Sequence, residues 1–362
     1  MHTVHTRTVH TASRTYDILI GEGLLDRAGP LCREVNSGGI RALIVTDSHV
    51  GPLYAARIAS SLQAAGYEVG IFTFPAGEEH KRLETISAIY SQLAAGHFTR
   101  TDLLIALGGG VTGDMTGFAA ATWLRGMDFV QIPTSLLAQV DSSVGGKTGV
   151  DIAEGKNLVG AFRQPARVLV DLVTLDTLPA AFCTDGMAEV IKAGCILDKG
   201  LFEDLADGNA LSPSRRIDTV TRAIAVKQGV VERDETETGE RKLLNFGHTL
   251  GHALEQYYHF TGLTHGCAVA LGMVAITRAS EQQGLTAPGT LDQLIPVLEA
   301  YGLPTADPAL RTDYLAGVSQ DKKRSGSHID LVVLEELGTA TLCRIPFDRL
   351  SAFLEGDPAA RG

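Results

Sequence analysis

The segment LLIALGGGVTGD, residues 103–114, places an apolar run directly before three consecutive glycines. An uninterrupted apolar run of this kind is typical of a strand buried on both faces of a parallel sheet. The glycines allow a tight turn before a following helix. The predicted strand spans 102–107, and further short apolar runs occur at 41–47, 67–74, 128–132 and 167–172.

Segments with apolar residues at helical spacing separate these strands, as at 53–65 and 83–95. The repeated alternation of strand and helix predicts an α/β domain with a mostly parallel, Rossmann-like sheet and helices on both faces.

From about residue 185 the pattern becomes helical. The predicted helices span 215–233, 245–257, 266–283 and 290–301, and two apolar segments at 328–334 and 339–345 predict a hairpin. We therefore expect two domains, residues 1–180 and 181–362, with a boundary near Pro179 and a mainly α-helical second domain.

Composition limits the class of protein. A net charge of −11 over 362 residues argues against nucleic-acid binding, although local Lys and Arg clusters can still bind an anionic substrate. Five dispersed cysteines without a C-x-x-C pattern indicate reduced thiols. Neither an apolar signal segment nor a membrane-spanning run is present, so we expect a soluble, cytoplasmic protein with no membrane partner.

Three histidines indicate a metal site. His248 and His252 are four residues apart and share one face of the predicted helix, and His265 follows a short loop. Two imidazoles with a carboxylate, which Glu189 offers, form a typical catalytic zinc set with one open position. Taken alone, a histidine pair at this spacing is more often part of an exposed helix face or a hydrogen-bonded pair in a polar core than a metal site.

Glycine turns and cations indicate an anion site. The glycines at 108–110 precede a predicted helix, where a phosphate can approach the backbone, although a tight turn without ligand has the same pattern. Lysines beside further glycine turns suit a substrate with phosphate and carboxylate groups.

The motifs DSSVGGK (141–147), GKN (155–157) and NFGHT (245–249) make the pattern specific. In this order and spacing the chain closely resembles the 3-dehydroquinate synthases, a family of sugar-phosphate cyclases, over residues 16–345. The resemblance implies a two-domain enzyme with NAD and Zn²⁺ in the cleft between its domains, usually a homodimer. Co²⁺ is compatible with the same ligands.

The family converts 3-deoxy-D-arabino-heptulosonate 7-phosphate to 3-dehydroquinate and phosphate, in the shikimate pathway. The resemblance implies transient oxidation by NAD, phosphate elimination, reduction and aldol closure. NAD is regenerated and so acts as a bound catalyst.

The resemblance also assigns residues. The implied metal ligands are Glu189, His248 and His265. The residues implied to hold NAD are Asp47, Glu78, Lys81, Gly109, Gly110, Asp114, Thr134, Ser135, Asp141, Lys147 and Lys156. Those implied to meet substrate are Lys147, Lys156, Asn157, Lys192, Lys227, Arg241, Asn245, His252 and Lys323. Arg125 matches an arginine that reaches the phosphate bound by the neighbouring subunit.

Three positions depart from the family pattern. Cys267 replaces a usual Glu, Ala76 replaces a common Asp, and Ser135 replaces a second Thr. We interpret Cys267 as a small buried hydrophobe; the alternative is a thiol that perturbs the metal site or makes it oxidisable.

Other functions remain open. Related cyclases make 2-deoxy-scyllo-inosose or 2-epi-5-epi-valiolone, but Arg241 and Asn245 favour a carboxylated substrate. A metal-dependent polyol dehydrogenase would not need the lysine cluster, and a non-catalytic binding module would have lost metal ligands.

Overall fold

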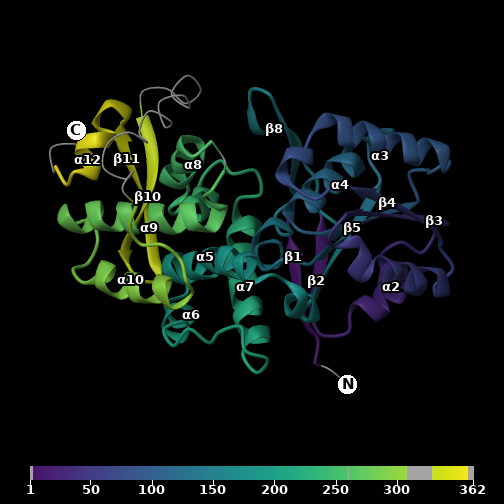
Figure 1. The fold of residues 1–362 in the computed structure, drawn as a ribbon, viewed down its shortest axis with the longest axis horizontal. Coiled ribbons are helices and arrows are strands. Elements are labelled where there is room, and N and C mark those ends of the chain that lie inside the picture. The colour runs from purple at the N-terminus through teal and green to yellow at the C-terminus, as the bar shows by residue number, and fades with distance from the viewer. Residues whose placement is uncertain (1–2, 260, 308–327, 358–362) are drawn as a thin grey trace. The chain divides into compact units, whose positions relative to one another are not determined.

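A computed structural model describes residues 3–259, 261–307 and 328–357 of the chain (Figure 1). The chain divides into two units, Met1–Pro179 and Ala180–Gly362, which are called unit 1 and unit 2 below. None of the helices in the described ranges is long and apolar enough to span a membrane.

Unit 1 contains a seven-stranded sheet in the order β1-β2-β9-β6-β5-β3-β4. β1 pairs antiparallel with β2, and all the other neighbouring pairs are parallel. β7 and β8 form a separate antiparallel hairpin. The strands are β1 (His5–His10), β2 (Thr15–Gly21), β3 (Arg41–Asp47), β4 (Glu68–Phe74), β5 (Leu103–Gly108), β6 (Asp128–Pro133), β7 (Lys147–Ile152), β8 (Gly155–Phe162) and β9 (Arg167–Asp171).

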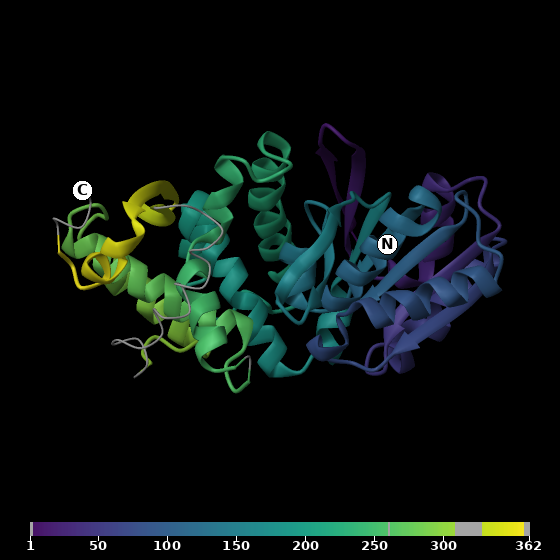
Figure 2. The ribbon, with the colours of Figure 1, turned by 90° about the horizontal axis from the view of Figure 1, so that it is seen from above.

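Helices cover both faces of this sheet (Figures 1 and 2). Every residue of β5 is buried, because its side chains alternate between two apolar layers. Ile105 joins the layer that contains Ile58 of α2, whereas Leu104 joins the layer that contains Ile89 of α3 and Met115 of α4. The helices are α1 (Ala28–Val35), α2 (Gly51–Ala64), α3 (Leu83–Ala95) and α4 (Gly110–Thr122).

In its described residues unit 2 is mainly helical, and an antiparallel hairpin in it carries a bulge between Leu334 and Glu336. β10 of this hairpin packs against α9 (Figure 1). The elements are α5 (Ala180–Leu197), α6 (Lys199–Asp204), α7 (Arg216–Arg233), α8 (His248–Tyr257), α9 (His265–Gln282), α10 (Thr290–Ala300), β10 (His328–Glu336), β11 (Thr339–Pro346) and α12 (Leu350–Leu354).

The predicted fold class, a mostly parallel α/β sheet followed by a helix-rich part, is confirmed. The five predicted strands begin and end within one residue of β3, β4, β5, β6 and β9. The pattern missed β1, which is rich in Thr and His, β2, and the hairpin of β7 and β8. The segment 245–247, predicted as helix, precedes α8, which begins only at His248 after Gly247 in the left-handed conformation.

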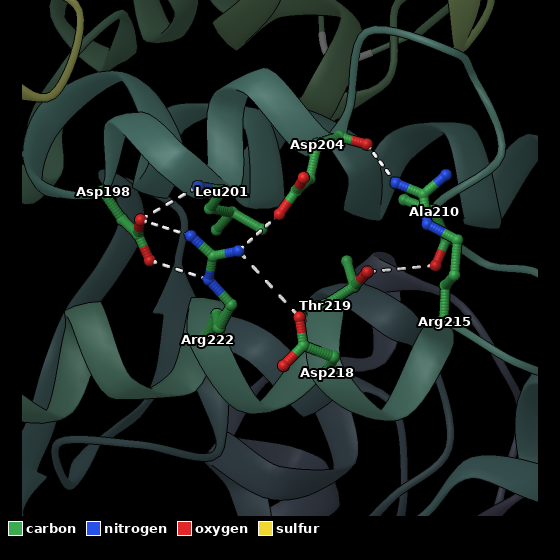
Figure 3. Close-up of polar contacts among 8 residues, drawn as sticks. All are labelled: Asp198, Leu201, Asp204, Ala210, Arg215, Asp218, Thr219 and Arg222. Carbon is green, nitrogen blue, oxygen red and sulfur yellow. Dashed lines mark hydrogen bonds and ion pairs between the residues drawn. The ribbon is translucent and has the colours of Figure 1, made fainter.

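Arg222 of α7 forms ion pairs with acidic residues at both ends of α6 (Figure 3). Its guanidinium lies 2.6 Å from Asp198 Oδ1 and 2.6 Å from Asp204 Oδ2. Asp198 also caps α6, accepting a hydrogen bond from the Leu201 amide at 2.9 Å. Burial acts to raise the pKa of Asp198, but the hydrogen bonds from Arg222 and Leu201 hold it below its usual value.

Asp171 fastens the end of β9 to the loop after β2. Its fully buried carboxylate accepts hydrogen bonds from the amides of Gly23 at 3.2 Å, Leu25 at 2.9 Å and Val173 at 3.2 Å. Hydrogen bonds to a charged acceptor are stronger than those between neutral groups, and these three satisfy backbone N–H groups that would otherwise lack an acceptor.

We predict that Asp171→Ala lowers the free energy of unfolding by about 2–3 kcal/mol, because buried amides lose their acceptor. Urea denaturation followed by circular dichroism measures the change. Glu84→Gln, which alters an exposed acid on α3, is the control and should leave the midpoint nearly unchanged. An Asp171→Ala midpoint equal to that of the parent would contradict the assigned role.

Candidate metal and nucleotide sites

Three side chains from separate helices of unit 2 meet at one point. Glu189 lies within α5, and His248 and His265 are the first residues of α8 and α9. Nε2 of His248 lies 3.5 Å, and Nε2 of His265 lies 3.7 Å, from Oε1 of Glu189. One donor atom from each residue falls within 4.8 Å of the other two, so the three can share a metal ion.

Glycines allow this convergence because the helices meet backbone to backbone. A Cβ on Gly266, beside His265, would lie 2.1 Å from the carbonyl oxygen of Asp185 in α5. A Cβ on Gly272 would lie 2.0 Å from the carbonyl oxygen of Gly247, which precedes His248. Any larger residue at either position would push apart the helices that carry the three side chains.

The carboxylate of Glu189 suits a cation. It is only 3% exposed, and neither of its oxygens accepts a hydrogen bond from the described residues. The Lys192 ammonium forms an ion pair with Oε2. Burial acts to raise the pKa of Glu189, but Lys192 and the two imidazoles hold it well below its usual range. The group is thus ionised, as a metal ligand must be.

The two imidazoles have different environments. Burial and the nearby Lys192 ammonium hold the pKa of His248 well below its usual value, so this ring is neutral and can bind a metal. Burial also acts to lower the pKa of His265, but the carboxylates of Glu189 and Glu255 raise it to about 10. A metal ion at the cluster would therefore replace a proton on His265.

Glu255 is a residue that the sequence analysis missed. Its Oε2 lies 3.7 Å from Nδ1 of His265, and it forms a second cluster with His252 and His265. Glu255 follows His252 by three positions, so helical spacing places the two on one face of α8. That spacing is the signal that would have found it.

Asn245 lies just before α8, at a pocket of about 290 Å³ in unit 2. Its amide donates a hydrogen bond to Glu237 at 3.1 Å, and Glu237 has a left-handed backbone with φ of 62°. An ion pair of 2.7 Å joins Lys242 to Asp330 at the same pocket. The pocket thus offers an amide and both signs of charge to a polar ligand.

Arg241 is 2% exposed and donates a hydrogen bond to the carbonyl oxygen of Glu235. Asp234 organises this turn, accepting from the amides of Thr238 at 2.9 Å, Gly239 at 2.7 Å and Arg241 at 3.0 Å. Burial acts to raise the pKa of Asp234, but these hydrogen bonds lower it to about 2.

The remaining predicted residues of unit 2 have varied positions. Lys227 is half-buried on α7, and His252 is exposed on α8. Lys323 lies outside the described residues.

Cys267 is half-buried rather than buried, so its interpretation as a small core residue is wrong. It follows Gly266 in the first turn of α9, where the helix is not fully covered.

In unit 1, several predicted residues lie where parallel strands end. Asp47 ends β3, and its Oδ1 accepts from the amides of His49 at 2.8 Å and Val50 at 2.9 Å. Gly109 and Gly110 follow β5 and begin α4. Ser135 lies against Gly109, where a Cβ would be 3.4 Å from its Oγ. The carboxyl ends of parallel strands are where α/β proteins bind ligands.

Thr134 and Asp141 come from the same region of the chain. The Thr134 amide donates to the carbonyl oxygen of Gly108 at 3.0 Å, which joins the ends of β5 and β6. Asp141 lies in a π-helical turn, Ala138–Ser142, with partial exposure. Such single π-turns are frequent at functional sites.

Lys81 links residues that sequence reasoning had assigned separately to NAD and substrate. Its Nζ lies 2.7 Å from Asp114 and donates to the Asn157 amide oxygen at 2.5 Å. Burial acts to lower the pKa of Lys81, but the Asp114 and Glu78 carboxylates raise it. Asn157 has φ of 55° and donates its amide to Asp151 at 2.7 Å. Glu78 is exposed in a short helical turn.

The other predicted cations of unit 1 lie nearer the surface. Lys147 is exposed at the start of β7, and Lys156 is half-buried on β8. Arg125 is exposed on a turn in which Leu124 and Arg125 both have positive φ, 47° and 67°. Such backbone is strained for residues with a Cβ and persists where the surroundings hold it in place.

Family comparisons agree with this geometry. Residues 71–185 match the model described as 3-dehydroquinate synthase N-terminal, and residues 186–324 match the model described as 3-dehydroquinate synthase C-terminal. The chain belongs to the 3-dehydroquinate synthase family. The resemblance predicted from the motifs is confirmed.

Similar 3-dehydroquinate synthases cover nearly the full length. The protein from Streptococcus suis is 45% identical over 352 residues, covering 96% of this chain and 99% of its own. The protein from Clostridium beijerinckii is 46% identical over 337 residues, covering 92% of this chain and 96% of its own.

Solved structures of related cyclases share the fold. A 2-deoxy-scyllo-inosose synthase with carbaglucose-6-phosphate, NAD⁺ and Co²⁺ has a TM-score of 0.86 at 25% identity, covering 99% of this chain and 100% of its own. The 2-epi-5-epi-valiolone synthase of Streptomyces hygroscopicus, with NAD⁺ and Zn²⁺, has a TM-score of 0.85 at 27% identity, covering 98% and 99%. The 3-dehydroquinate synthase family thus shares its architecture with cyclases of other substrates.

The Asp234 turn gives a prediction for pH. Because the pKa of Asp234 is lowered on folding, its contribution to stability is present above the ordinary carboxyl pKa and is lost as the pH falls toward 2. We expect Asp234→Asn to lower the free energy of unfolding at pH 7 by about 1–2 kcal/mol, and the difference from the parent to shrink between pH 5 and pH 2. Urea denaturation at several pH values measures it.

The control for this experiment is Asp292→Asn, which changes an exposed carboxylate at the start of α10. It should show a much smaller difference at every pH. A pH-independent effect of Asp234→Asn would contradict the assignment of an ionised carboxylate at the centre of the turn.

Proposed function

We propose that the chain is a 3-dehydroquinate synthase, which converts 3-deoxy-D-arabino-heptulosonate 7-phosphate to 3-dehydroquinate and phosphate in aromatic amino-acid biosynthesis. The observation that carries the proposal is the convergence of the buried Glu189 with the half-buried His248 and His265 in a chain of this family. The near-complete coverage of relatives that bear this name supports it.

In this proposal Glu189, His248 and His265 hold Zn²⁺ or Co²⁺. One carboxylate and two imidazoles leave a coordination position for a substrate oxygen. The ligand set is compatible with either ion, and the two cyclase structures above contain one each. When bound, the metal acidifies a substrate hydroxyl and NAD takes up and returns a hydride.

We assign NAD binding to unit 1 and metal and substrate binding to unit 2. Lys147 and Lys156, on the hairpin of β7 and β8 in unit 1, also bind substrate in this proposal. The support for NAD is the set of groups at the carboxyl ends of β3, β5 and β6, together with the pair of Lys81 and Asp114. Asp47 and Glu78 supply carboxylates of the kind that accept hydrogen bonds from ribose hydroxyls. Gly109 and Gly110 leave the start of α4 open to phosphate.

The chain's own residues bind and orient the substrate. Lys192, beside Glu189, can hold an oxygen atom of the substrate near the ligand set. Asn245 and His252 supply hydrogen bonds, and Arg241 and Lys227 supply positive charge for the carboxylate. In our proposal Lys147, Lys156 and Lys323 also supply positive charge to the substrate, and Asn157 supplies a further hydrogen bond. Lys323 lies outside the described residues.

Proton transfer in this scheme requires no dedicated side-chain base. An oxygen atom of the substrate's own phosphate accepts the proton from the carbon next to the oxidised one, and the phosphate then leaves. The protein's contribution is then orientation and electrostatic stabilisation, which the cations named above can provide.

We also propose a cytoplasmic homodimer. The exposed position of Arg125 on its strained turn supports contact with a second subunit, whose phosphate site it would reach. The dispersed cysteines, none of them joined in a disulfide, suit a reducing compartment.

Phosphate release tests the proposed function. With Zn²⁺-loaded protein, catalytic NAD⁺ and the heptulosonate 7-phosphate, we expect one phosphate per 3-dehydroquinate and no net NADH. Chelation should abolish the reaction, and Zn²⁺ or Co²⁺ should restore it. Sedimentation of the same preparation should give twice the mass of the 38.4 kDa chain.

Other outcomes would identify the alternatives. Phosphate release only from glucose 6-phosphate or sedoheptulose 7-phosphate would assign the chain to another cyclase reaction. Net NADH from a simple polyol would assign it to the dehydrogenases.

A further inference from the structure

The imidazole of His265 lies between two carboxylates. Its Nε2 is 3.7 Å from Oε1 of Glu189, and its Nδ1 is 3.7 Å from Oε2 of Glu255. The two ring nitrogens thus face acids from different helices, α5 and α8. Only the acid on the Nε2 side belongs to the proposed ligand set.

Glu255 is built into the core of unit 2 rather than exposed on its surface. It is 7% exposed and follows the buried residues Ala253 and Leu254 on α8. A buried carboxylate needs compensating partners, since desolvation of the charge is costly. The Nδ1 atom of His265, 3.7 Å away, is one such partner.

The chemistry of imidazole gives this contact a direction. A ring that binds a metal through one nitrogen carries its proton on the other nitrogen. A carboxylate at that second nitrogen fixes the tautomer and the ring orientation, and it makes the ligating nitrogen more basic. Glu255 lies on the Nδ1 side of His265, so the nitrogen left for the metal is Nε2, the one beside Glu189.

We propose that Glu255 is a positioning residue of the metal centre, which accepts the Nδ1–H of His265 and directs Nε2 toward the site shared with Glu189 and His248. Because α8 carries both Glu255 and His248, one helix sets the position of two ligands. The inference rests on the proposed function only in taking the cluster of Glu189, His248 and His265 as the metal site.

Cobalt binding to the metal-free protein tests the proposal without any activity assay. Chelator competition gives the Co²⁺ affinity, and the visible absorption of bound Co²⁺ reports the ligand geometry. We expect Glu255→Ala to weaken Co²⁺ binding by roughly 10- to 100-fold and to change the spectrum. Glu255→Gln should lie between Glu255→Ala and the parent, since its amide oxygen can still accept the Nδ1–H.

Two further variants complete the design. Glu203→Gln removes an exposed carboxylate from α6 and should bind Co²⁺ as the parent does. Glu189→Gln alters the proposed ligand itself and should weaken binding more than either Glu255 variant. Circular dichroism and thermal melting of each metal-free protein establish that it is folded, and Glu255→Gln, which keeps the volume of the side chain, carries the test if Glu255→Ala does not fold.

The outcomes separate this inference from the proposed function. Parent-like affinity and spectrum in folded Glu255 variants would overturn the positioning role. Two Co²⁺ ions per chain, one lost with Glu255, would overturn it in favour of a second site at His252, Glu255 and His265. Parent-like binding by Glu189→Gln would instead show that the proposed ligand set is wrong, and a failure to release phosphate leaves the cobalt results unaffected.

Discussion

The burial of Glu189 is the constraint on which unit 2 depends. An ionised carboxylate that is 3% exposed requires nearby positive or polar groups, and here they come from three helices: Lys192 of α5, His248 of α8 and His265 of α9. Helices can bring these groups so close only where backbones touch, which explains the glycines that begin or precede α8 and α9. The geometry of the metal site therefore depends directly on the close packing of these helices.

Much of the fold could be predicted because apolar patterns are local. The strands at 41–47 and 103–108 consist almost wholly of buried residues, so a parallel sheet with two covered faces follows from composition alone. The edge strand β1, HTRTVH, has only one buried residue and shows no such pattern. The hairpin of β7 and β8 was missed for a similar reason, because its glycines and lysines are typical of loops.

The candidate site was predictable to a different extent. Helical spacing grouped His248 with His252, but 59 positions separate Glu189 from His248, so Glu189 was assigned from the donor set that zinc requires and from the family resemblance, not from local spacing. Lys81 and Asn157 show the same limit, since their contact joins the turn after Glu78–His80 to β8, 76 positions further along the chain, and no local pattern predicts it. Glu255 was within reach of the spacing argument, yet its partner His265 lies on another helix.

The central claim is that two imidazoles and one carboxylate form the metal site. X-ray absorption at the zinc edge of the Zn²⁺-loaded protein tests it most directly. The account predicts only nitrogen and oxygen neighbours at about 2.0–2.2 Å, including the outer-shell scattering of two imidazoles. A sulfur neighbour at about 2.3 Å, which Cys267 could supply, or a shell without imidazole would contradict it.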